Sequence, residues 1–345
     1  MKLSFSAQDE RKWERLCETR AQNNLVTRIY SHYLNHTPRF LTADMVEDLA
    51  RDCGISTEDA FCTMFSAALG LDSAENADHR RLERLYIREG VRLLDTSTYA
   101  EDPYLQTIRF PEAEIGKWRF TWESYAPYEP FVCGHPKLTD ELQEIPQLGA
   151  FAKEFRFPAV LENGVEWMTV TPNEIETMRA PIAEAHGNAV TFGLGLGYFA
   201  FRASQKPSVE TLTVVERDAD VIELFRKRLL PQFPHREKIR ILQADAFDYL
   251  KTDFRAQRFD TAFVDLWHDA SDGLELYLRF KKLESLFPET SFSYWIEPSL
   301  LSCLRELVLQ KITDPKDPSP RVIHTFDELS LLLSKEGLQT LAGGI

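Results

Sequence analysis

The chain has 345 residues, of which 43% are hydrophobic and 27% charged, the composition of a globular protein of two or three domains. Its formal net charge of −14 opposes long-range attraction to nucleic acids and anionic membranes, and no run of Lys and Arg offers a local basic patch.

Five scattered cysteines form no CxxC pair, so the sequence predicts neither a metal site nor a disulfide framework. The first residues lack the apolar core of a signal peptide, and the longest apolar stretch, 190–201, is too short to cross a bilayer. We therefore expect a soluble cytoplasmic protein with reduced thiols.

Residues 8–100 are predicted to be helical, because apolar side chains recur at helical spacing. These side chains are Trp13, Leu16, Leu25, Ile29, Tyr33, Leu82, Leu85, Val91 and Leu94. Residues 49–60 have the spacing of a helix-turn-helix with Gly54 in the turn. The second helix, 57–69, carries no Lys or Arg, so an ordinary corner between two helices is favoured over DNA reading.

The composition changes at about residue 104, where Pro, Gly and aromatic residues become frequent and short alternating runs predict a small β-rich segment. The aromatic cluster 118–131 is interpreted as the core of this segment. We expect three parts: a helical N-terminal domain at 1–103, a β-rich segment at 104–166 and a nucleotide-binding domain at 167–345.

From residue 167 onward, strands and helices alternate. Thr171 and Glu174 have the spacing of a capping box with Pro172 at the first helical position, which is a sufficient explanation for both side chains. The helix is expected to end at His186. Strands are predicted at 188–192, 211–215, 239–242, 259–264 and 293–296, and further helices at 198–204, 218–230, 300–310 and 326–333. The pattern predicts an α/β fold with a Rossmann-like, mostly parallel, doubly wound sheet.

A glycine loop, Gly193-Leu194-Gly195-Leu196-Gly197, follows the first of these strands. Glycines allow a sharp turn and close approach to a ligand, and the following helix offers free N–H groups. Glu216 closes the second strand at the distance expected for a ribose-binding acid. The dinucleotide pattern would place a third glycine where Tyr198 stands, which argues against an NAD-dependent dehydrogenase.

The spacing resembles motif I of the class I S-adenosylmethionine-dependent methyltransferases, and three later landmarks extend the resemblance: the acid at Glu216, the run 243–246 and the run 260–265. The resemblance implies S-adenosylmethionine as cofactor. It implies that Gly193, Gly195 and Gly197 form the cofactor loop, that Glu216 binds the ribose, and that Asp245 and Ala246 form the adenine-binding turn. Asp245 can also cap the following helix.

Within this superfamily, the runs 245–250 and 259–265 are most similar to the spermidine-synthase-like branch. There, an Asp at the end of the fourth strand deprotonates the attacking amine, and Asp265 occupies that place. The chain departs from the branch directly afterwards, since Leu266-Trp267-His268-Asp269 replaces a short polar stretch containing Pro. The first hundred residues match no part of that branch.

Asp265 and His268 are the candidate catalytic bases, and Trp267 and Asp269 the candidate substrate-binding residues, because all four follow the fourth strand. Two alternatives stay open: His268 could be a loop histidine bonded to a neighbouring Asp, and Trp267 could serve only in packing.

These features predict methyl transfer from S-adenosylmethionine to a nitrogen or oxygen of a small molecule. Aminopropyl transfer from decarboxylated S-adenosylmethionine and cofactor binding without catalysis are the alternatives. We expect no nucleic-acid or membrane partner, and the sequence leaves open whether the chain forms a homodimer.

Overall fold

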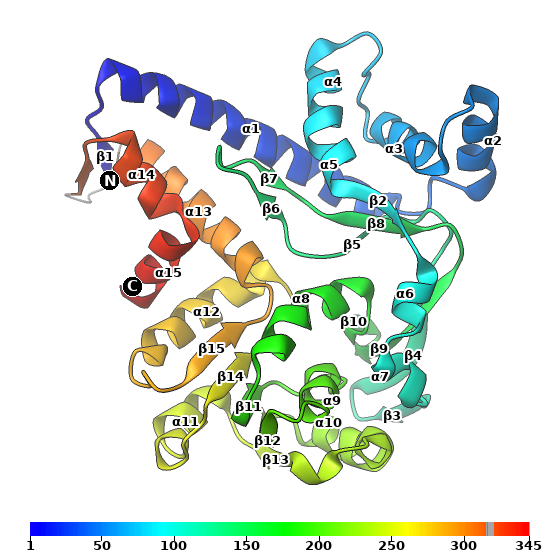
Figure 1. Cartoon of the computed structure of the whole chain (residues 1–345), viewed down its shortest axis with the longest axis vertical. Coiled ribbons are helices and arrows are strands. Elements are labelled where there is room, and N and C mark those ends of the chain that lie inside the picture. The colour runs from blue at the N-terminus through cyan, green and yellow to red at the C-terminus, as the bar shows by residue number, and fades with distance from the viewer. Residues whose placement is uncertain (315, 317–320, 345) are drawn as a thin grey trace.

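The structure is a computed structural model that describes residues 1–314, 316 and 321–344. Figure 1 shows the N-terminal helices at one end of the molecule and a parallel sheet with its helices at the other. The two ends of the chain approach each other, because β1 (Lys2–Leu3) pairs in parallel with β16 (Val322–Ile323).

Helices dominate the first hundred residues. They are α1 (Ala7–His36), α2 (Ala43–Cys53), α3 (Thr57–Ala68), α4 (Ala77–Leu82) with a π-helical turn at Glu83–Ile87, α5 (Arg88–Gly90) and α6 (Thr96–Ala100). Gly54 joins α2 to α3 in the left-handed conformation, and Ser56 caps α3 by accepting a hydrogen bond from the Asp59 N–H. A core rich in Phe and Tyr holds the second half of α1 against α2–α5.

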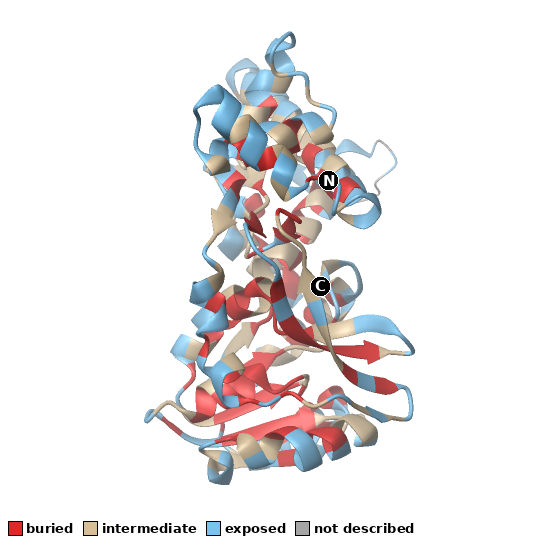
Figure 2. Cartoon of the chain, turned by 90° about the vertical axis from the view of Figure 1, so that its right-hand side faces the viewer, coloured by how far each residue is buried: buried red, intermediate tan, exposed pale blue. Residues whose placement is uncertain are grey.

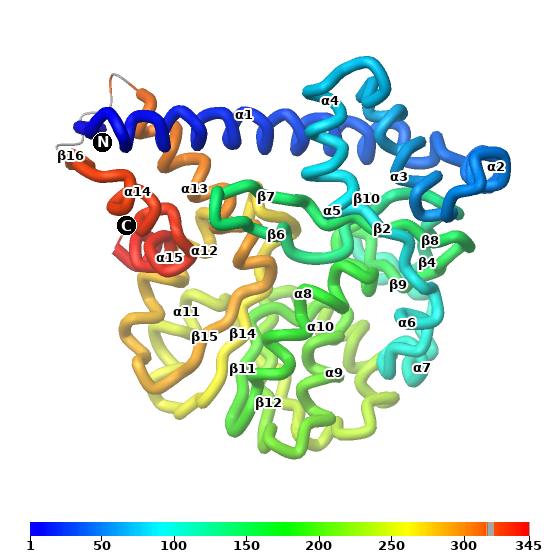
Figure 3. The backbone as a smooth tube through the Cα atoms, turned by 45° about the horizontal axis from the view of Figure 1, so that its top comes forward, coloured from blue at the N-terminus to red at the C-terminus, as the bar shows by residue number. Residues whose placement is uncertain are grey.

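The long helix α1 also spans the molecule. In Figure 3 it runs alongside the C-terminal helices. Arg20 on α1 makes an ion pair of 2.7 Å with Glu306 on α13 (Glu297–Thr313), which ties the N-terminal helices to the C-terminal half of the chain.

The middle of the chain, around α7 (Pro103–Thr107), is built mainly from antiparallel strands. One sheet has the order β10-β9-β4-β3 and is antiparallel throughout. In another, β8 pairs in parallel with β2, which precedes α7, and antiparallel with β5. The strands are β2 (Val91–Leu94), β3 (Ala113–Ile115), β4 (Trp118–Tyr125), β5 (Phe131–Val132), β6 (Lys137–Leu138), β7 (Glu144–Ile145), β8 (Leu148–Phe151), β9 (Phe155–Glu162) and β10 (Val165–Thr169).

The five-stranded sheet of the C-terminal half is entirely parallel, with the order β13-β12-β11-β14-β15. Its strands are β11 (Gly187–Phe192), β12 (Val209–Glu216), β13 (Ile239–Gln243), β14 (Thr261–Val264) and β15 (Ser291–Tyr294). Buried residues concentrate along these strands, and the helices beside them turn exposed residues outward (Figure 2). This is the Rossmann-like order, and its direction reverses between β11 and β14, where such sheets bind ligands at the strand carboxyl ends.

The helices of this half are α8 (Pro172–Glu184), α9 (Tyr198–Ser204), α10 (Ala219–Leu224), α11 (Ala246–Lys251), α12 (Ala270–Glu284), α13 (Glu297–Thr313), α14 (Phe326–Leu333) and α15 (Lys335–Gly344). Within the described ranges, no helix combines the length and apolar character needed to cross a membrane.

Three expectations need correction. Val91 and Leu94 belong to strand β2 rather than to a helix, because they pair with β8 far along the chain. The helix α12 between β14 and β15 was not predicted, and β15 begins two residues before the predicted strand. The capping box at Thr171 is wrong: Pro172 does open α8, but the Thr171 side chain makes no capping hydrogen bond.

Candidate functional site

The glycine loop joins β11 to α9 at the reversal point of the sheet. All three glycines have positive φ, from 55° to 98°. A Cβ at Gly193 would lie 1.9 Å from the Asp265 carbonyl oxygen, and one at Gly195 would lie 2.0 Å from the Met168 sulfur. Only glycine therefore allows the loop to turn here while packed between β14 and the strand β10 above it.

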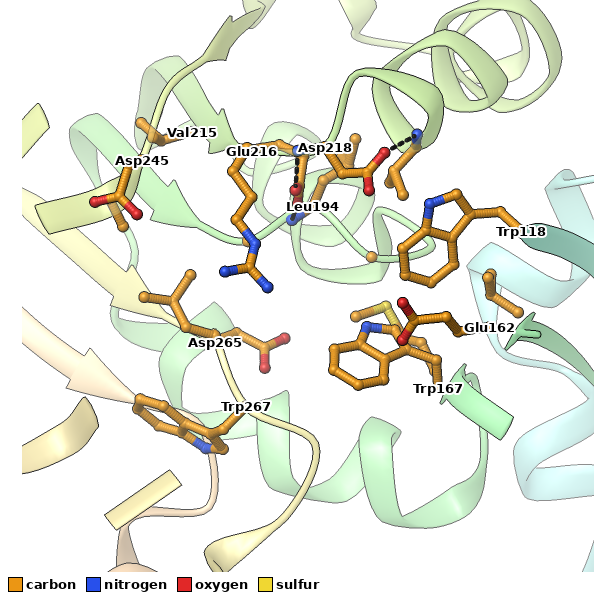
Figure 4. A pocket seen from close by; sticks show the side chains of 18 of the residues that line it. Trp118, Glu162, Trp167, Leu194, Val215, Glu216, Asp218, Asp245, Asp265 and Trp267 are labelled. Atoms are coloured by element: carbon orange, nitrogen blue, oxygen red, sulfur yellow. Dashed lines mark hydrogen bonds between the residues drawn. The ribbon is translucent and has the colours of Figure 1, made fainter. Parts of the chain in front are cut away.

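A cavity of about 460 Å³ opens over this loop. Figure 4 shows its lining, with Asp245 at one side, Glu216 above the centre, Asp265 below it, and Trp118 and Trp167 at the other side. Gly193 and Gly195 line this cavity, whereas Gly197 does not, because it packs against Phe225. The structure thus brings residues of β11, β12, β13 and β14 to one space.

Glu216 ends β12 with its carboxylate in this cavity. One oxygen accepts a hydrogen bond of 3.1 Å from the Leu194 N–H, and the other accepts one of 2.8 Å from the Asp218 N–H. Burial raises the pKa of Glu216, and these backbone hydrogen bonds act in the opposite direction. Each oxygen keeps a lone pair that a ligand hydroxyl can use.

Asp245 caps α11, because one of its oxygens accepts from the backbone N–H groups of Phe247 and Asp248 at 2.9 and 3.1 Å. Its other oxygen has no hydrogen-bond donor among the residues that the structure describes, and the residue lines the cavity beside Ala246. Capping leaves this second oxygen free for a donor on a ligand.

Asp265 follows the last residue of β14 and lies where the first cavity meets a second one. Its carboxylate points into the pocket toward Trp167 (Figure 4). Among the described residues, no group donates a hydrogen bond to this carboxylate. Burial, together with the negative charge of Glu216, raises its pKa from 3.8 to about 7. A carboxylate of this kind accepts a proton readily near neutral pH.

The second cavity has a volume of about 340 Å³ and shares Asp265, Trp267, Trp167 and Met168 with the first. Carboxylates and aromatic rings line it, and neither Lys nor Arg is among its lining residues. The further acids are Glu129, Glu166 and Glu174, and the further aromatic side chains are Tyr125, Phe131, His268 and Trp295.

Glu174 is the residue whose role the sequence reasoning missed. Because the capping box does not form, its carboxylate faces this cavity, and no described group donates a hydrogen bond to it. Burial, together with the charges of Asp265 and Glu166, raises the pKa of Glu174 well above its ordinary value. Burial also raises the pKa of Glu166, against the influence of His268. Within the described part of the chain, Glu129 is the one of these acids that forms an ion pair, with Arg39 at 2.9 Å.

The remaining candidates divide into two groups. Trp267 is buried and lines both cavities, and its indole N–H has no hydrogen-bond partner among the described residues. His268 lines the second cavity, with its ring 5.8 Å from that of Trp167. Asp269 lines neither cavity. It caps α12 and shares a capping box with Asp272.

Residues of β4, β9 and β10 cover the first cavity and form its roof, whereas the sequence predicts that the aromatic cluster 118–131 is the core of the β-rich segment. Trp118 and Trp167 stand edge to face at 6.2 Å, and the buried indole N–H of Trp118 has no partner. Lys117 makes an ion pair with Glu162 and lies 3.9 Å from Asp218. Nothing local in the sequence brings these residues over the glycine loop, because the roof forms by pairing of β4 with β9, some forty residues apart.

Among the residues that the structure describes, no group of three or more His, Cys, Asp and Glu side chains could hold a metal ion. Glu216, Asp245 and Asp265 each offer carboxylate oxygens that can accept hydrogen bonds from a ligand.

No protein-family model matches the chain, and no curated protein matches it in sequence. Solved structures that resemble it include a spermidine synthase in complex with the transition state analogue AdoDATO, with 20% identity and a TM-score of 0.32. Another is the spermidine synthase from Thermotoga maritima, with 18% identity and a TM-score of 0.30. Each match covers 40% of this chain and about half of the other, 54% and 52% respectively.

Proposed function

We propose that the protein transfers the methyl group of S-adenosylmethionine to an amine nitrogen of a small molecule. The cofactor would occupy the first cavity and the acceptor the second. The observation that carries the proposal is the position of Asp265, an unpartnered buried carboxylate at the junction of the two cavities.

The lining of the first cavity fits a positively charged nucleoside. Seven charged side chains line it, five acidic and two basic, and one of the basic ones, Lys117, is paired with Glu162. Glu216 would accept from the ribose hydroxyls, and the free oxygen of Asp245 would accept from the adenine amino group. An excess of carboxylates over basic groups favours a sulfonium over a neutral or anionic ligand.

The second cavity supports an amine as the acceptor. Glu166 and Glu174 have raised pKa values caused mainly by burial, so a bound cation would lower the cost of ionising them. Trp167, Trp267 and Trp295 line the same space, and the faces of aromatic rings attract cations. A neutral hydroxyl compound would leave these carboxylates uncompensated.

The protein would act chiefly by placement and proton removal. Bound S-adenosylmethionine supplies an activated carbon at its sulfonium. The cavity walls hold the acceptor nitrogen next to it and exclude water, and Asp265 takes the proton that the nitrogen loses. His268, at the edge of the second cavity, is the other residue able to accept this proton.

A second candidate, aminopropyl transfer from decarboxylated S-adenosylmethionine, is favoured by one observation. Arg217 is the sole basic residue lining the first cavity outside the Lys117–Glu162 pair, so few groups can neutralise a cofactor carboxylate. A cofactor that ends in an ammonium group suits the acidic junction at Asp265 and Glu174.

The test is a turnover assay in which the protein is incubated with either cofactor and a panel of mono- and diamines, with products identified by mass spectrometry. We expect a methylated amine, and Asp265→Asn should abolish it. Asp269→Asn is the matched control, because it changes a neighbouring acid outside both cavities and Asn still caps a helix. A propylamine adduct would establish the second candidate, and equal activity of both variants with wild type would remove Asp265 from the mechanism.

A further inference from the structure

Tyr198 occupies the place of the third glycine of a dinucleotide-binding loop, and the structure shows what it does there. It is the first residue of α9, it is buried, and its hydroxyl donates a hydrogen bond of 3.0 Å to Asp102. Arg202, one turn further along α9, donates to the same carboxylate oxygen at 2.5 Å. The helix that follows the glycine loop is therefore anchored to a residue almost one hundred positions earlier.

The same early segment also holds the loop itself. Tyr104, on α7, is fully buried, and its hydroxyl donates a hydrogen bond of 2.6 Å to the carbonyl oxygen of Leu196. The other oxygen of Asp102 accepts from the Tyr104 N–H at 2.8 Å and so caps α7. The Tyr104 ring packs edge-on against Tyr198 and Phe201.

The loop depends on such a partner, because three residues with positive φ cannot form a regular hydrogen-bonded structure. Two backbone bonds brace it, from Gly193 N–H to Val215 and from Gly197 N–H to Leu194. Tyr104 supplies the donor for the carbonyl of Leu196 between the last two glycines. Without this donor the carbonyl would be buried and unpaired, a state that favours rotation of the peptide.

We infer that Tyr104 is a positioning residue for the cofactor, and that Asp102 and Tyr104 make the N-terminal region part of the cofactor-binding apparatus. Tyr104 does not line the first cavity, whereas Gly193, Leu194 and Gly195 do, so it acts through the loop. The inference rests on the proposed function only for the identity of the ligand.

The experiment compares Tyr104→Phe with Tyr277→Phe in the full chain. Tyr277 is also fully buried, and its hydroxyl donates a hydrogen bond of 2.8 Å to Glu297, away from both cavities. Each variant loses one phenolic hydroxyl and keeps the ring. The measurements are the calorimetric Kd of S-adenosylhomocysteine and the hydrogen–deuterium exchange of residues 193–198.

Tyr104→Phe should raise the Kd about tenfold and speed exchange in the loop, since a lost buried hydrogen bond is of that size. Tyr277→Phe should change neither. Asp102→Asn, which keeps the helix cap but removes the charge facing Arg202, should shift both quantities in the same direction as Tyr104→Phe.

An unchanged Kd in Tyr104→Phe, or an equal loss in Tyr277→Phe, would overturn the inference. If the wild-type protein binds no S-adenosyl ligand, the proposed function fails, and loop exchange alone then decides: equal rates in wild type and Tyr104→Phe overturn the positioning role.

Discussion

Replacement of Asp265 by Asn should make the protein without ligand more stable at alkaline pH while it abolishes turnover. Asp265 is a buried acid with a pKa of about 7 and no hydrogen-bond partner among the described residues. Its ordinary value of 3.8 describes the unfolded chain. The folded protein therefore binds the proton more tightly, and stability falls as the pH rises from about 4 to about 7.

The size of the effect follows from these two pKa values. Relative to the fully protonated protein, the shift lowers the free energy of unfolding by about 1.7 kcal/mol at pH 5 and by about 4.3 kcal/mol at pH 8. Asn carries no charge, so the variant avoids this further loss of about 2.6 kcal/mol between the two pH values. For a chain of 345 residues, that difference corresponds to about 4 °C in Tm. Relief of the repulsion between Asp265 and Glu174 acts in the same direction.

Differential scanning calorimetry of both proteins at pH 5 and pH 8 measures this difference. Asp248→Asn serves as control, because Asp248 is an exposed acid on α11, 4.0 Å from Lys251. The gain in Tm from Asp265→Asn should be about 4 °C larger at pH 8 than at pH 5, and Asp248→Asn should show no such trend. An equal gain at the two pH values, or a loss at pH 8, would refute the claim that Asp265 ionises at a cost.

Three further predictions concern the pH profile, the acceptor and the fold. In steady-state assays, turnover should rise with pH through about 7, because Asp265 must be ionised to accept a proton; a profile flat from pH 5 to 9 contradicts this. Glu174→Gln should raise the KM for the amine about tenfold and leave the Kd of S-adenosylhomocysteine unchanged, whereas equal losses in both would place Glu174 in the cofactor site. Glu144 accepts hydrogen bonds from the buried Arg305 and from Ser302, so Glu144→Gln should lower the free energy of unfolding in urea titrations by about 3 kcal/mol. A change below about 1 kcal/mol would show that the Glu144–Arg305 pair contributes little to stability.

The grouping of residues around the first cavity could be predicted because its determinants are local. Gly193 and Gly195 follow a buried strand, Glu216 ends β12, and Asp265 directly follows β14. In a parallel sheet, strand ends meet at one edge, so a linear pattern is enough to bring these residues together.

The second cavity could not be predicted, because residues far apart in the sequence form it. Thr171 and Glu174 have the spacing of a capping box, yet Thr171 makes no capping hydrogen bond, and Glu174 lines a cavity together with residues of the β-rich segment. Asp269 is the opposite case. The sequence predicts that it binds substrate, but in the structure it caps α12, a helix that the sequence pattern does not reveal.

The roof and the loop support were missed for the same reason. Trp118 reaches the glycine loop only through the pairing of β4 with β9, and Tyr104 only through the packing of α7 on α9. A cluster of aromatic residues read along the sequence indicates a core and carries no information about which cavity it closes.

The central claim is that the first cavity binds an S-adenosyl cofactor. Parallel calorimetric titrations of the wild-type protein with S-adenosylmethionine, its decarboxylated form, S-adenosylhomocysteine and NAD test it most directly. The account predicts saturable binding of the S-adenosyl compounds, weakened in Glu216→Ala, and no binding of NAD. Binding of NAD alone, or of none of the four, would contradict it.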